Sequence, residues 1–399
     1  MYRVGRRRGR QLLGVVAASA AAVLLVPAVA GAAFSGSNGK IAFVSSRNNT
    51  VAVQQVDPGV ADGTAGGDLT ATTQLTVGSV DAEPFYSPDG TKVTFSSNRS
   101  GSVWSIYVMD PSDTTEATPA SLVSATEFST AHDDYAPSFT DDGRAAVFNR
   151  DNVWIETAVV ASGATSDCTL YAPPTHLAPA SGDNGSGSRI VFDPVSPSTL
   201  AYVGGDGHIH LVTGVIPPTA ALPCPVQSHL VDTDLSAGAT GSSTTPYVDA
   251  NPDWSPDGSR IVFDSTRGGI HTLWFLSGPT SLSPSVSPVW PGSTATATQP
   301  VFSPDGNQIA YTQPVVHNGT QVLAYVVALG QPQSHAVDLS LGAGAAANSQ
   351  PAWQPSFPNP NLPEAPAPLL LPGAGLLVGG GVLAVRTRRN RLPRHRITL

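Results

Sequence analysis

A short turn sequence, Ser-Pro-Asp-Gly, recurs along the chain between two apolar segments. The three complete copies begin at Pro84, Pro252 and Pro300, and each leads into a strand-like run such as Thr91–Phe95. Proline fixes φ, the Asp side chain accepts hydrogen bonds within the turn, and Gly adopts positive φ. The pattern therefore predicts a repeated β-hairpin, and a repeat limits the fold more strongly than any single motif.

The spacing of the repeat gives the size of the structural unit. Aligning the turns gives intervals of 53, 56, 59 and 48 residues, with two weaker copies between the complete ones. The aligned positions are Ser87, Thr140, Ser196, Ser255 and Ser303. Asn38–Phe43 matches only the second half of a unit, and Ser349–Pro355 matches only the first half.

Together these copies make six units of about 50 residues, each long enough for four short strands. The sequence therefore predicts an all-β fold, a six-bladed β-propeller over residues 34–357. The two half-units would combine into one blade, so that pairing of the N- and C-terminal strands closes the ring. Closure of this kind removes the free sheet edges that invite aggregation.

The residues of the repeat resemble those of a known family. Ser-Pro-Asp-Gly is followed by Ile-Val-Phe at Ile261–Phe263, and another unit contains Ile-Tyr-Val-Met-Asp at Ile106–Asp110. This combination is similar to the TolB-like, WD-repeat-like β-propeller repeat, and the similarity covers nearly all of residues 38–356. The resemblance implies the propeller fold; within the family, TolB itself binds a peptidoglycan-associated lipoprotein.

The motif of one class of propeller enzyme does not occur in the sequence. Enzymes of the prolyl-oligopeptidase kind add a hydrolase domain with a G-x-S-x-G nucleophile elbow. This chain contains no G-x-S-x-G. We therefore expect a protein without catalytic activity.

The charge distribution argues against nucleic-acid binding. Of the 20 basic residues, five lie in residues 1–10 and six in residues 386–396, which leaves nine against 29 acidic residues in the body. An acidic surface repels phosphate backbones and anionic membranes, and it suits cations or basic partners.

The N-terminal end has the features of an export signal. Residues 1–33 combine a basic start, an apolar run and small residues that fit a cleavage site, which together predict a signal peptide. The Arg6–Arg8 cluster leaves both the general and the twin-arginine export routes open.

The C-terminal end has the features of a membrane anchor. A Pro-rich linker, residues 358–366, contains Leu-Pro-Glu-Ala-Pro and precedes an apolar stretch, residues 367–385, that is long enough to span a bilayer as a helix. The basic residues 386–399 would stay in the cytoplasm, with the propeller at the cell surface. The arrangement resembles bacterial sorting signals, and both enzymatic cleavage and a retained anchor remain open.

The chain contains two cysteines, Cys168 and Cys224. In an exported protein they are expected to form a disulfide, here between similar positions of adjacent blades.

Polar residues cluster just before the leading Pro of the repeat. In a propeller these positions would surround one mouth of the central channel, where carboxylates could hold Ca²⁺ or receive a basic segment of a partner. The alternative, which we favour, is that each Asp hydrogen-bonds backbone groups locally. The candidate ligand-binding residues are Asp81, Glu83, Asp133, Asp134, Asp249, Asn251 and Asn348.

Arginine also recurs at one position of the repeat. Arg47, Arg99 and Arg267 each lie four residues after the strand Phe, and Arg150 lies two residues after it. We expect these residues to form ion pairs between blades rather than to bind anions. The expected partners are the turn residues Asp89, Asp142, Asp257 and Asp305.

Aromatic and imidazole side chains give two further expectations. Trp104, Trp154 and Trp274 are expected to pack in the blades rather than to stack on sugars. His208 and His210 lie on one face of a predicted strand, at a spacing compatible with metal binding. No third ligand is adjacent, so we expect no cofactor, with Ca²⁺ as the alternative. The candidate metal ligands are His208, His210, Asp81, Asp134 and Asp249.

The sequence thus predicts an exported, envelope-anchored propeller. It would act as a monomer that binds an envelope protein, a peptide or a glycan without catalysis. The alternative is a polysaccharide lyase or hydrolase that uses His and acidic residues at the channel mouth, among them His132 and His271.

Overall fold

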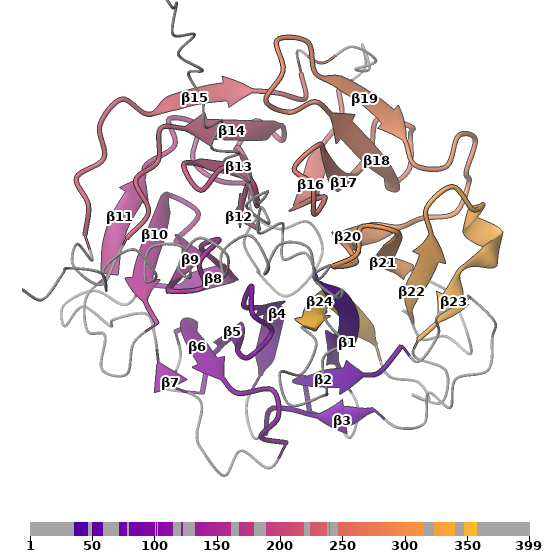
Figure 1. Ribbon diagram of the computed structural model, residues 1–399, viewed down its shortest axis with the longest axis horizontal. Coiled ribbons are helices and arrows are strands. Elements are labelled where there is room, and N and C mark those ends of the chain that lie inside the picture. The colour runs from indigo at the N-terminus through magenta and orange to yellow at the C-terminus, as the bar shows by residue number, and fades with distance from the viewer. Residues whose placement is uncertain are drawn as a thin grey trace, which may run out of the picture.

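The computed structural model describes most of the repeat region. The described residues are 36–46, 50–58, 72–77, 80–99, 101, 103–114, 121–122, 132–160, 167–178, 189–218, 224–237, 239, 246–313, 323–339 and 347–356. They form six four-stranded antiparallel sheets that are arranged in a ring (Figure 1).

Five of these sheets consist of consecutive strands. The first contains β4 (Asp81–Tyr86), β5 (Val93–Ser97), β6 (Ser105–Met109) and β7 (Ser121–Leu122). The second contains β8 (Asp134–Phe139), β9 (Ala145–Arg150), β10 (Trp154–Val159) and β11 (Asp167–Tyr171). The third contains β12 (Val191–Phe192), β13 (Thr199–Val203), β14 (Ile209–Thr213) and β15 (Val231–Asp234).

The next two sheets follow the same plan. One contains β16 (Asp249–Trp254), β17 (Arg260–Ser265), β18 (Thr272–Ser277) and β19 (Ser285–Pro288). The other contains β20 (Thr298–Phe302), β21 (Gln308–Gln313), β22 (Leu323–Ala328) and β23 (Val337–Asp338). In each sheet the first strand is innermost, so it lines the centre of the ring.

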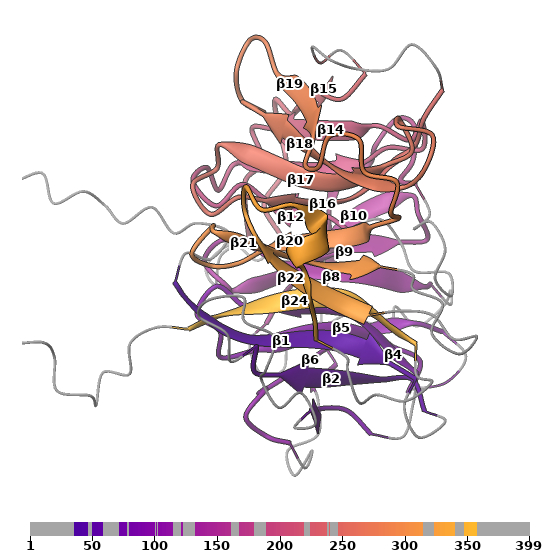
Figure 2. The same ribbon diagram turned by 90° about the vertical axis from the view of Figure 1, so that its right-hand side faces the viewer.

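The remaining sheet joins the two ends of the chain. It has the order β24 (Asn348–Ser356), β1 (Ser37–Ser45), β2 (Ala52–Val56) and β3 (Thr73–Gln74), and is named here the closing sheet. β1 and β24 pair in antiparallel fashion from Ser37–Ser356 to Ser45–Asn348. Both views place the two strands side by side (Figures 1 and 2).

The structure corrects the predicted fold in two respects. A count of continuous blades gives five rather than six, because the closing sheet is assembled from both chain ends. The described residues contain no α-helix, only a 3₁₀ turn at Gln333–His335, and none of their helices is long and apolar enough to cross a membrane. The predicted signal (1–33), linker (358–366), spanning segment (367–385) and tail (386–399) lie outside the described residues.

The repeated turn forms as its residues predict. Ser87 Oγ donates to Asp89 Oδ1 at 2.6 Å and accepts from the Lys92 N–H at 2.9 Å, while Gly90 has φ 67°. Partial burial opposes ionisation of Asp89, but its hydrogen bonds with Ser87 and Thr91 outweigh burial and lower its pKa. The turn therefore joins the first two strands of a sheet through a side-chain network.

The hydrophobic core lies between neighbouring sheets. One cluster combines Val191 and Ile209 with the fully buried Trp254 and Phe263 of the following sheet. The aromatic and β-branched residues of the repeat therefore join the blades to one another, as expected for sheets packed face to face.

The two cysteines form a disulfide, as the sequence predicts. Cys168 in β11 is bonded to Cys224, which precedes β15, and their α-carbons are 5.4 Å apart. The bond links two adjacent sheets.

We expect Gly90→Ala to weaken closure of the ring. A β-carbon at Gly90 would lie 2.0 Å from the Pro355 carbonyl oxygen of β24, whereas one at Gly306, in the same turn of another sheet, would only touch Pro256 at 3.5 Å. Both substitutions cost about 1–2 kcal/mol for positive φ, and the clash should cost Gly90→Ala about 1–3 kcal/mol more. Urea unfolding of the two variants measures the difference, and equal losses would contradict this account.

Candidate functional site

The predicted Asp ring consists of buried ion pairs. Asp249 accepts from Arg267 Nη2 at 2.6 and 2.7 Å, and both side chains are fully buried. Asp134 pairs with Arg150 at 2.8 Å and Asp81 pairs with Arg99 at 3.2 Å. Burial raises the pKa of Asp249, and the Arg267 charge and hydrogen bonds only partly offset this.

These contacts change the interpretation of both repeat positions. The recurrent Arg residues pair with the Asp at the start of the innermost strand of their own sheet, not with a turn Asp of a neighbouring blade. Because the carboxylates are already neutralised by guanidinium groups, the pairs support a structural role for Asp81, Asp134 and Asp249. Arg47 lies outside the described residues.

Removing one of these cations should destabilise the fold strongly. Arg267→Met leaves the carboxylate of Asp249 buried without its partner, which costs about 3–5 kcal/mol. The matched control is Arg144→Met, because Arg144 pairs with Asp142 at 3.6 Å with 65% of its side chain exposed. That control should cost less than about 1 kcal/mol. Chemical denaturation compares the two, and similar losses would contradict the structural role.

A second ring of residues lies two positions further along the innermost strands than the Asp ring. Each innermost strand except β12 has one residue with φ between 49° and 56° directly before its Pro, and its pairing shifts there. The following Pro disfavours the right-handed helical conformation for each of these residues, and the bulge there bends the strand. These residues are Glu83, Ala136, Asn251, Gln299 and Gln350.

The side chains of this channel ring bind the backbone of the next blade. The Ala136 N–H donates to Glu83 Oε2 at 2.6 Å, and the Glu83 N–H donates to Gln350 Oε1 at 2.9 Å. The Gln350 N–H donates in turn to Gln299 Oε1 at 3.0 Å. An acceptor side chain at this position therefore fastens neighbouring sheets together at the axis.

Asp264 replaces one of these contacts. Its Oδ1 accepts from the Gln299 N–H at 3.0 Å and from Asn251 Nδ2 at 2.8 Å. Of the predicted ligand residues, Glu83 thus joins two blades directly, and Asn251 bonds to Asp264, which joins the next pair. Asn348 is fully buried at the start of β24.

Arg189 completes the channel ring and was not predicted from the sequence. The Asp193 N–H donates to the Thr199 carbonyl oxygen, just as the Ser87 N–H donates to the Lys92 carbonyl oxygen. Asp193 therefore corresponds to Ser87, and Arg189, four residues earlier, takes the position of Glu83. Its Nη2 reaches the Pro351 carbonyl of the closing sheet, opposite in the ring, at 3.5 Å. The degenerate turn of this unit hid the equivalence, although Arg189 stands directly before an Ile-Val-Phe segment.

Arg189 influences a buried carboxyl group nearby. Burial raises the pKa of Asp253 to about 7, although the Arg189 charge and a 2.8 Å hydrogen bond from the Phe302 N–H favour the ionised form. Burial likewise lowers the pKa of Arg189, against the charges of Asp253 and Glu83. The centre of the propeller therefore contains charges that have lost their hydration.

Asp253 should make the fold less stable as the pH rises. Its folded-state pKa of about 7 exceeds the ordinary 3.8. Its contribution to folding stability is therefore fully present below about pH 4 and is lost as the pH rises through 7. The free energy of unfolding of Asp253→Asn, relative to that of wild type, should therefore rise by about 2–4 kcal/mol between pH 4 and pH 8. Urea unfolding at both pH values measures this gain.

The control for this experiment lies in the same hairpin. The hydrogen bonds of Asp257 with Ser255 and Ser259 lower its pKa despite the opposing effect of burial. Asp257→Asn should consequently lose stability relative to wild type as the pH rises from its folded to its unfolded pKa. A difference in stability between Asp253→Asn and wild type that does not change with pH would contradict the raised pKa of Asp253.

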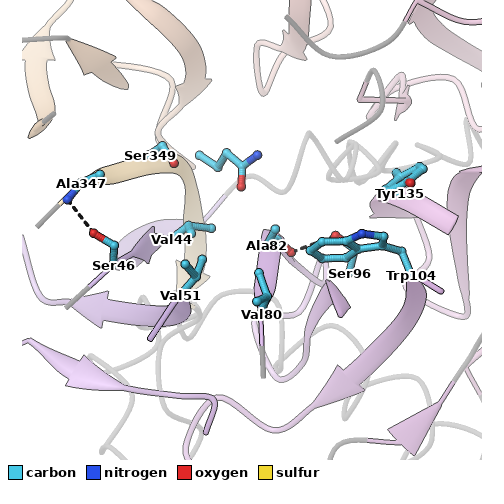
Figure 3. A pocket seen from close by; sticks show the side chains of 11 residues that line it. Val44, Ser46, Val51, Val80, Ala82, Ser96, Trp104, Tyr135, Ala347 and Ser349 are labelled. Carbon is cyan, nitrogen blue, oxygen red and sulfur yellow. Dashed lines mark hydrogen bonds between the residues drawn. The ribbon is translucent and has the colours of Figure 1, made fainter. Parts of the chain in front are cut away.

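A cavity of about 100 Å³ lies between the closing sheet and the β4–β7 sheet. Figure 3 shows Ser46 and Ser349 on one side of it and Trp104 and Tyr135 on the other, with Val80 between them. These residues stand at the starts of innermost strands or near the turns between second and third strands. Antiparallel pairing places all of these positions at one end of the sheets, which we name the entry face.

Asp133 contacts both residues of the aromatic wall of this cavity. Its Oδ1 accepts from the Trp104 backbone N–H at 2.9 Å, and its side chain hydrogen-bonds with Tyr135, whose ring is 6.1 Å from that of Trp104. Burial, followed by the charge and hydrogen bond of Asp133, raises the pKa of Tyr135 above its usual range. Trp104 is half-buried and faces the cavity, whereas the sequence predicted a packing role for it.

The histidines of the entry face lie beside carboxylates. His132 contacts Asp151, and His271 Nδ1 lies 3.4 Å from Asp264, whose hydrogen bond raises the His271 pKa against the effect of burial. His210 belongs to a larger group with Asp206, Asp232 and Asp234.

His210 is held in its charged form. Burial favours the neutral ring, but hydrogen bonds and charges from Asp232 and Asp206 outweigh burial and raise its pKa to about 9. Among the described residues, possible metal ligands converge at Asp206, His210 and Asp234, and this group includes none of the predicted ligands Asp81, Asp134 and Asp249.

The fold defines a β-propeller protein. No family model matches the chain, and no curated protein sequence matches it. Among solved structures, TolB from Acinetobacter baumannii is similar over 80% of this chain and 67% of its own, with TM-score 0.51 and 15% identity.

Two further structures show the range of the likeness. A putative TolB from Agrobacterium tumefaciens is similar over 80% of this chain and 99% of its own, with TM-score 0.45 and 15% identity. Hydrazine synthase from Kuenenia stuttgartiensis is similar over 83% of this chain and 50% of its own, with TM-score 0.52 and 10% identity. The likeness to TolB and hydrazine synthase concerns the propeller fold alone.

Proposed function

We propose that this chain is an exported, envelope-anchored propeller that binds a protein, peptide or glycan segment at its entry face without catalysis. The cavity beside Trp104 and Tyr135 is the observation that carries the proposal. Aromatic rings and hydroxyl groups that converge on one pocket are typical of ligand sites.

The size of the cavity supports binding of part of a longer ligand. Its volume of about 100 Å³ is well below the roughly 300–1,000 Å³ of pockets that enclose a drug-sized molecule. One side chain or one sugar ring would enter it, and the rest of the ligand would lie across the entry face.

The chemistry of the lining supports a neutral or basic group. Residues that border the cavity include Ser46, Ser96, Ser349 and Gln350, which offer hydroxyl and amide groups, and none of its lining residues is cationic. The carboxylate of Asp133 lies directly behind the aromatic wall. An anionic group would meet this charge without a compensating partner.

Export and anchoring rest on the two chain ends. The basic and apolar pattern of residues 1–33 supports secretion, and residues 367–385 with the basic tail support a membrane tether. The disulfide between Cys168 and Cys224 is consistent with an oxidising compartment outside the cytoplasm.

The test is a binding screen of the purified full-length chain against cell-wall glycan fragments and phage-displayed peptides. Trp104→Ala should weaken binding of a selected ligand at least tenfold, because a stacking or packing surface worth about 1.4 kcal/mol or more is removed. Fluorescence titration measures the dissociation constant.

Trp290→Ala is the matched control. Trp290 is also half-buried, but it lies in a different surface groove beside Gln331 and Gln333. Its removal should leave affinity unchanged. Equal loss in both variants, or no ligand in either screen, would contradict the proposed site, and conversion of a bound glycan into product would contradict the non-catalytic role.

A further inference from the structure

Three side chains of metal-ligating types converge in the β12–β15 sheet at the entry face, and His208 lies beside two of them. His210 Nε2 lies 3.0 Å from Asp206 Oδ2, and His208 Nδ1 lies 2.9 Å from Asp234 Oδ2 and 4.0 Å from Asp206 Oδ2. One ligand atom each from Asp206, His210 and Asp234 lies within 4.8 Å of the other two. Tetrahedral zinc with bonds of about 2.0–2.2 Å separates its ligand atoms by roughly 3.3–3.6 Å, so small side-chain movements suffice.

Strand pairing brings these residues together. His208 and His210 are two residues apart and share one face of the hairpin, and His210 is paired with Asp234 across β14 and β15. Asp206 lies in the tight turn that precedes β14. His210 and Asp234 therefore come from paired strands, which hold side chains precisely, while Asp206 and His208 come from the tight turn that joins β13 to β14.

A second layer of hydrogen bonds orients His210. Its Nδ1 lies 3.0 Å from Asp232 Oδ1, and Asp232 Oδ2 accepts from the hydroxyl groups of Tyr171 at 2.7 Å and Tyr202 at 2.6 Å. Metal-bound histidines commonly donate their second ring N–H to such a carboxylate. This arrangement leaves Nε2 directed toward Asp206.

The backbone of Gly204 makes room for the group. A β-carbon there would lie 2.6 Å from Asp206 Oδ1 and 2.8 Å from His210 Nε2. Asp234 is also positioned, because its Oδ1 accepts from the Ala237 N–H at 3.0 Å while Oδ2 faces His208.

We propose that Asp206, His210 and Asp234, with His208 as a fourth ligand, bind a divalent transition metal of the zinc class. Two imidazole nitrogens and two carboxylate oxygens suit Zn²⁺, whereas Ca²⁺ prefers six to eight oxygen ligands. The side chains of Asp206 and Asp234 are 33% and 32% exposed, so an ion reaches them from solvent. Binding at His210 Nε2 displaces the proton on that nitrogen, which is released to solvent.

The test is calorimetric titration of the full-length, chelator-treated chain with ZnCl₂, and in parallel with CaCl₂. One Zn²⁺ should bind per chain and raise the thermal unfolding temperature, and Ca²⁺ should bind much more weakly. Asp206→Asn and Asp234→Asn should each weaken zinc binding at least tenfold. Retention of wild-type affinity in both variants, equal affinity for Ca²⁺, or no zinc binding at all would overturn the proposal.

Two further variants separate a metal site from ordinary His–Asp pairing. Asp151→Asn removes the carboxylate from the His132–Asp151 pair of the adjacent sheet and should leave zinc affinity unchanged. Asp232→Asn should weaken it about 10–100-fold and keep one ion per chain, because Asp232 positions His210 without touching the metal. With Co²⁺ as the probe, the visible absorption bands of tetrahedral coordination should appear in wild type and disappear in Asp206→Asn, and their persistence there would also overturn the assignment.

Discussion

Pairing of β1 with β24 is the contact on which the ring depends. It joins residues more than 300 positions apart, and without it the closing sheet would leave two open edges. Side chains extend the closure to both neighbouring blades: the Asp305 N–H donates to Asn38 Oδ1 at 3.2 Å, and Gln354 Nε2 donates to the Gly90 oxygen at 2.8 Å. Every sheet then has two neighbours, so the core between blades is continuous. Because contacts this distant have a high loop-closure entropy, closing the ring is expected to be a late step of folding.

The propeller fold could be predicted from the sequence because turn chemistry is local. Pro, Asp and Gly determine the hairpin through φ preferences and short-range hydrogen bonds, and the half-units at the two ends identify the closing blade. The importance of the recurrent Arg was also predictable, because four of the nine basic residues in the body of the chain share one repeat position. Their partners were not: the pairing of Arg267 with Asp249 depends on the direction in which adjacent strands point their side chains. Arg189 was missed because its unit lacks the Asp-Gly turn that defines the alignment.

The centre of the ring is occupied by groups that bind one another. Glu83, Gln299 and Gln350 place their acceptor oxygens on backbone N–H groups of adjacent blades, and Arg189 crosses the axis to the opposite blade. The space left among them is about 20 Å³, enough for roughly one water molecule. Among the described residues, this space is too small for a polymer to pass, which favours a ligand at a face over one threaded through the ring.

The entry face offers two kinds of chemistry on a rigid support. The cavity beside Trp104 is aromatic and neutral, while the group around His210 collects three carboxylates and two imidazoles on another sheet. Asp133 and Asp151 lie between them in sequence and in the ring, so negative charge extends over this part of the face. A cation bound by Asp206 and Asp234 would neutralise part of that charge and change which ligands the face accepts. Metal binding and ligand binding would then be coupled through electrostatics, without any movement of the blades.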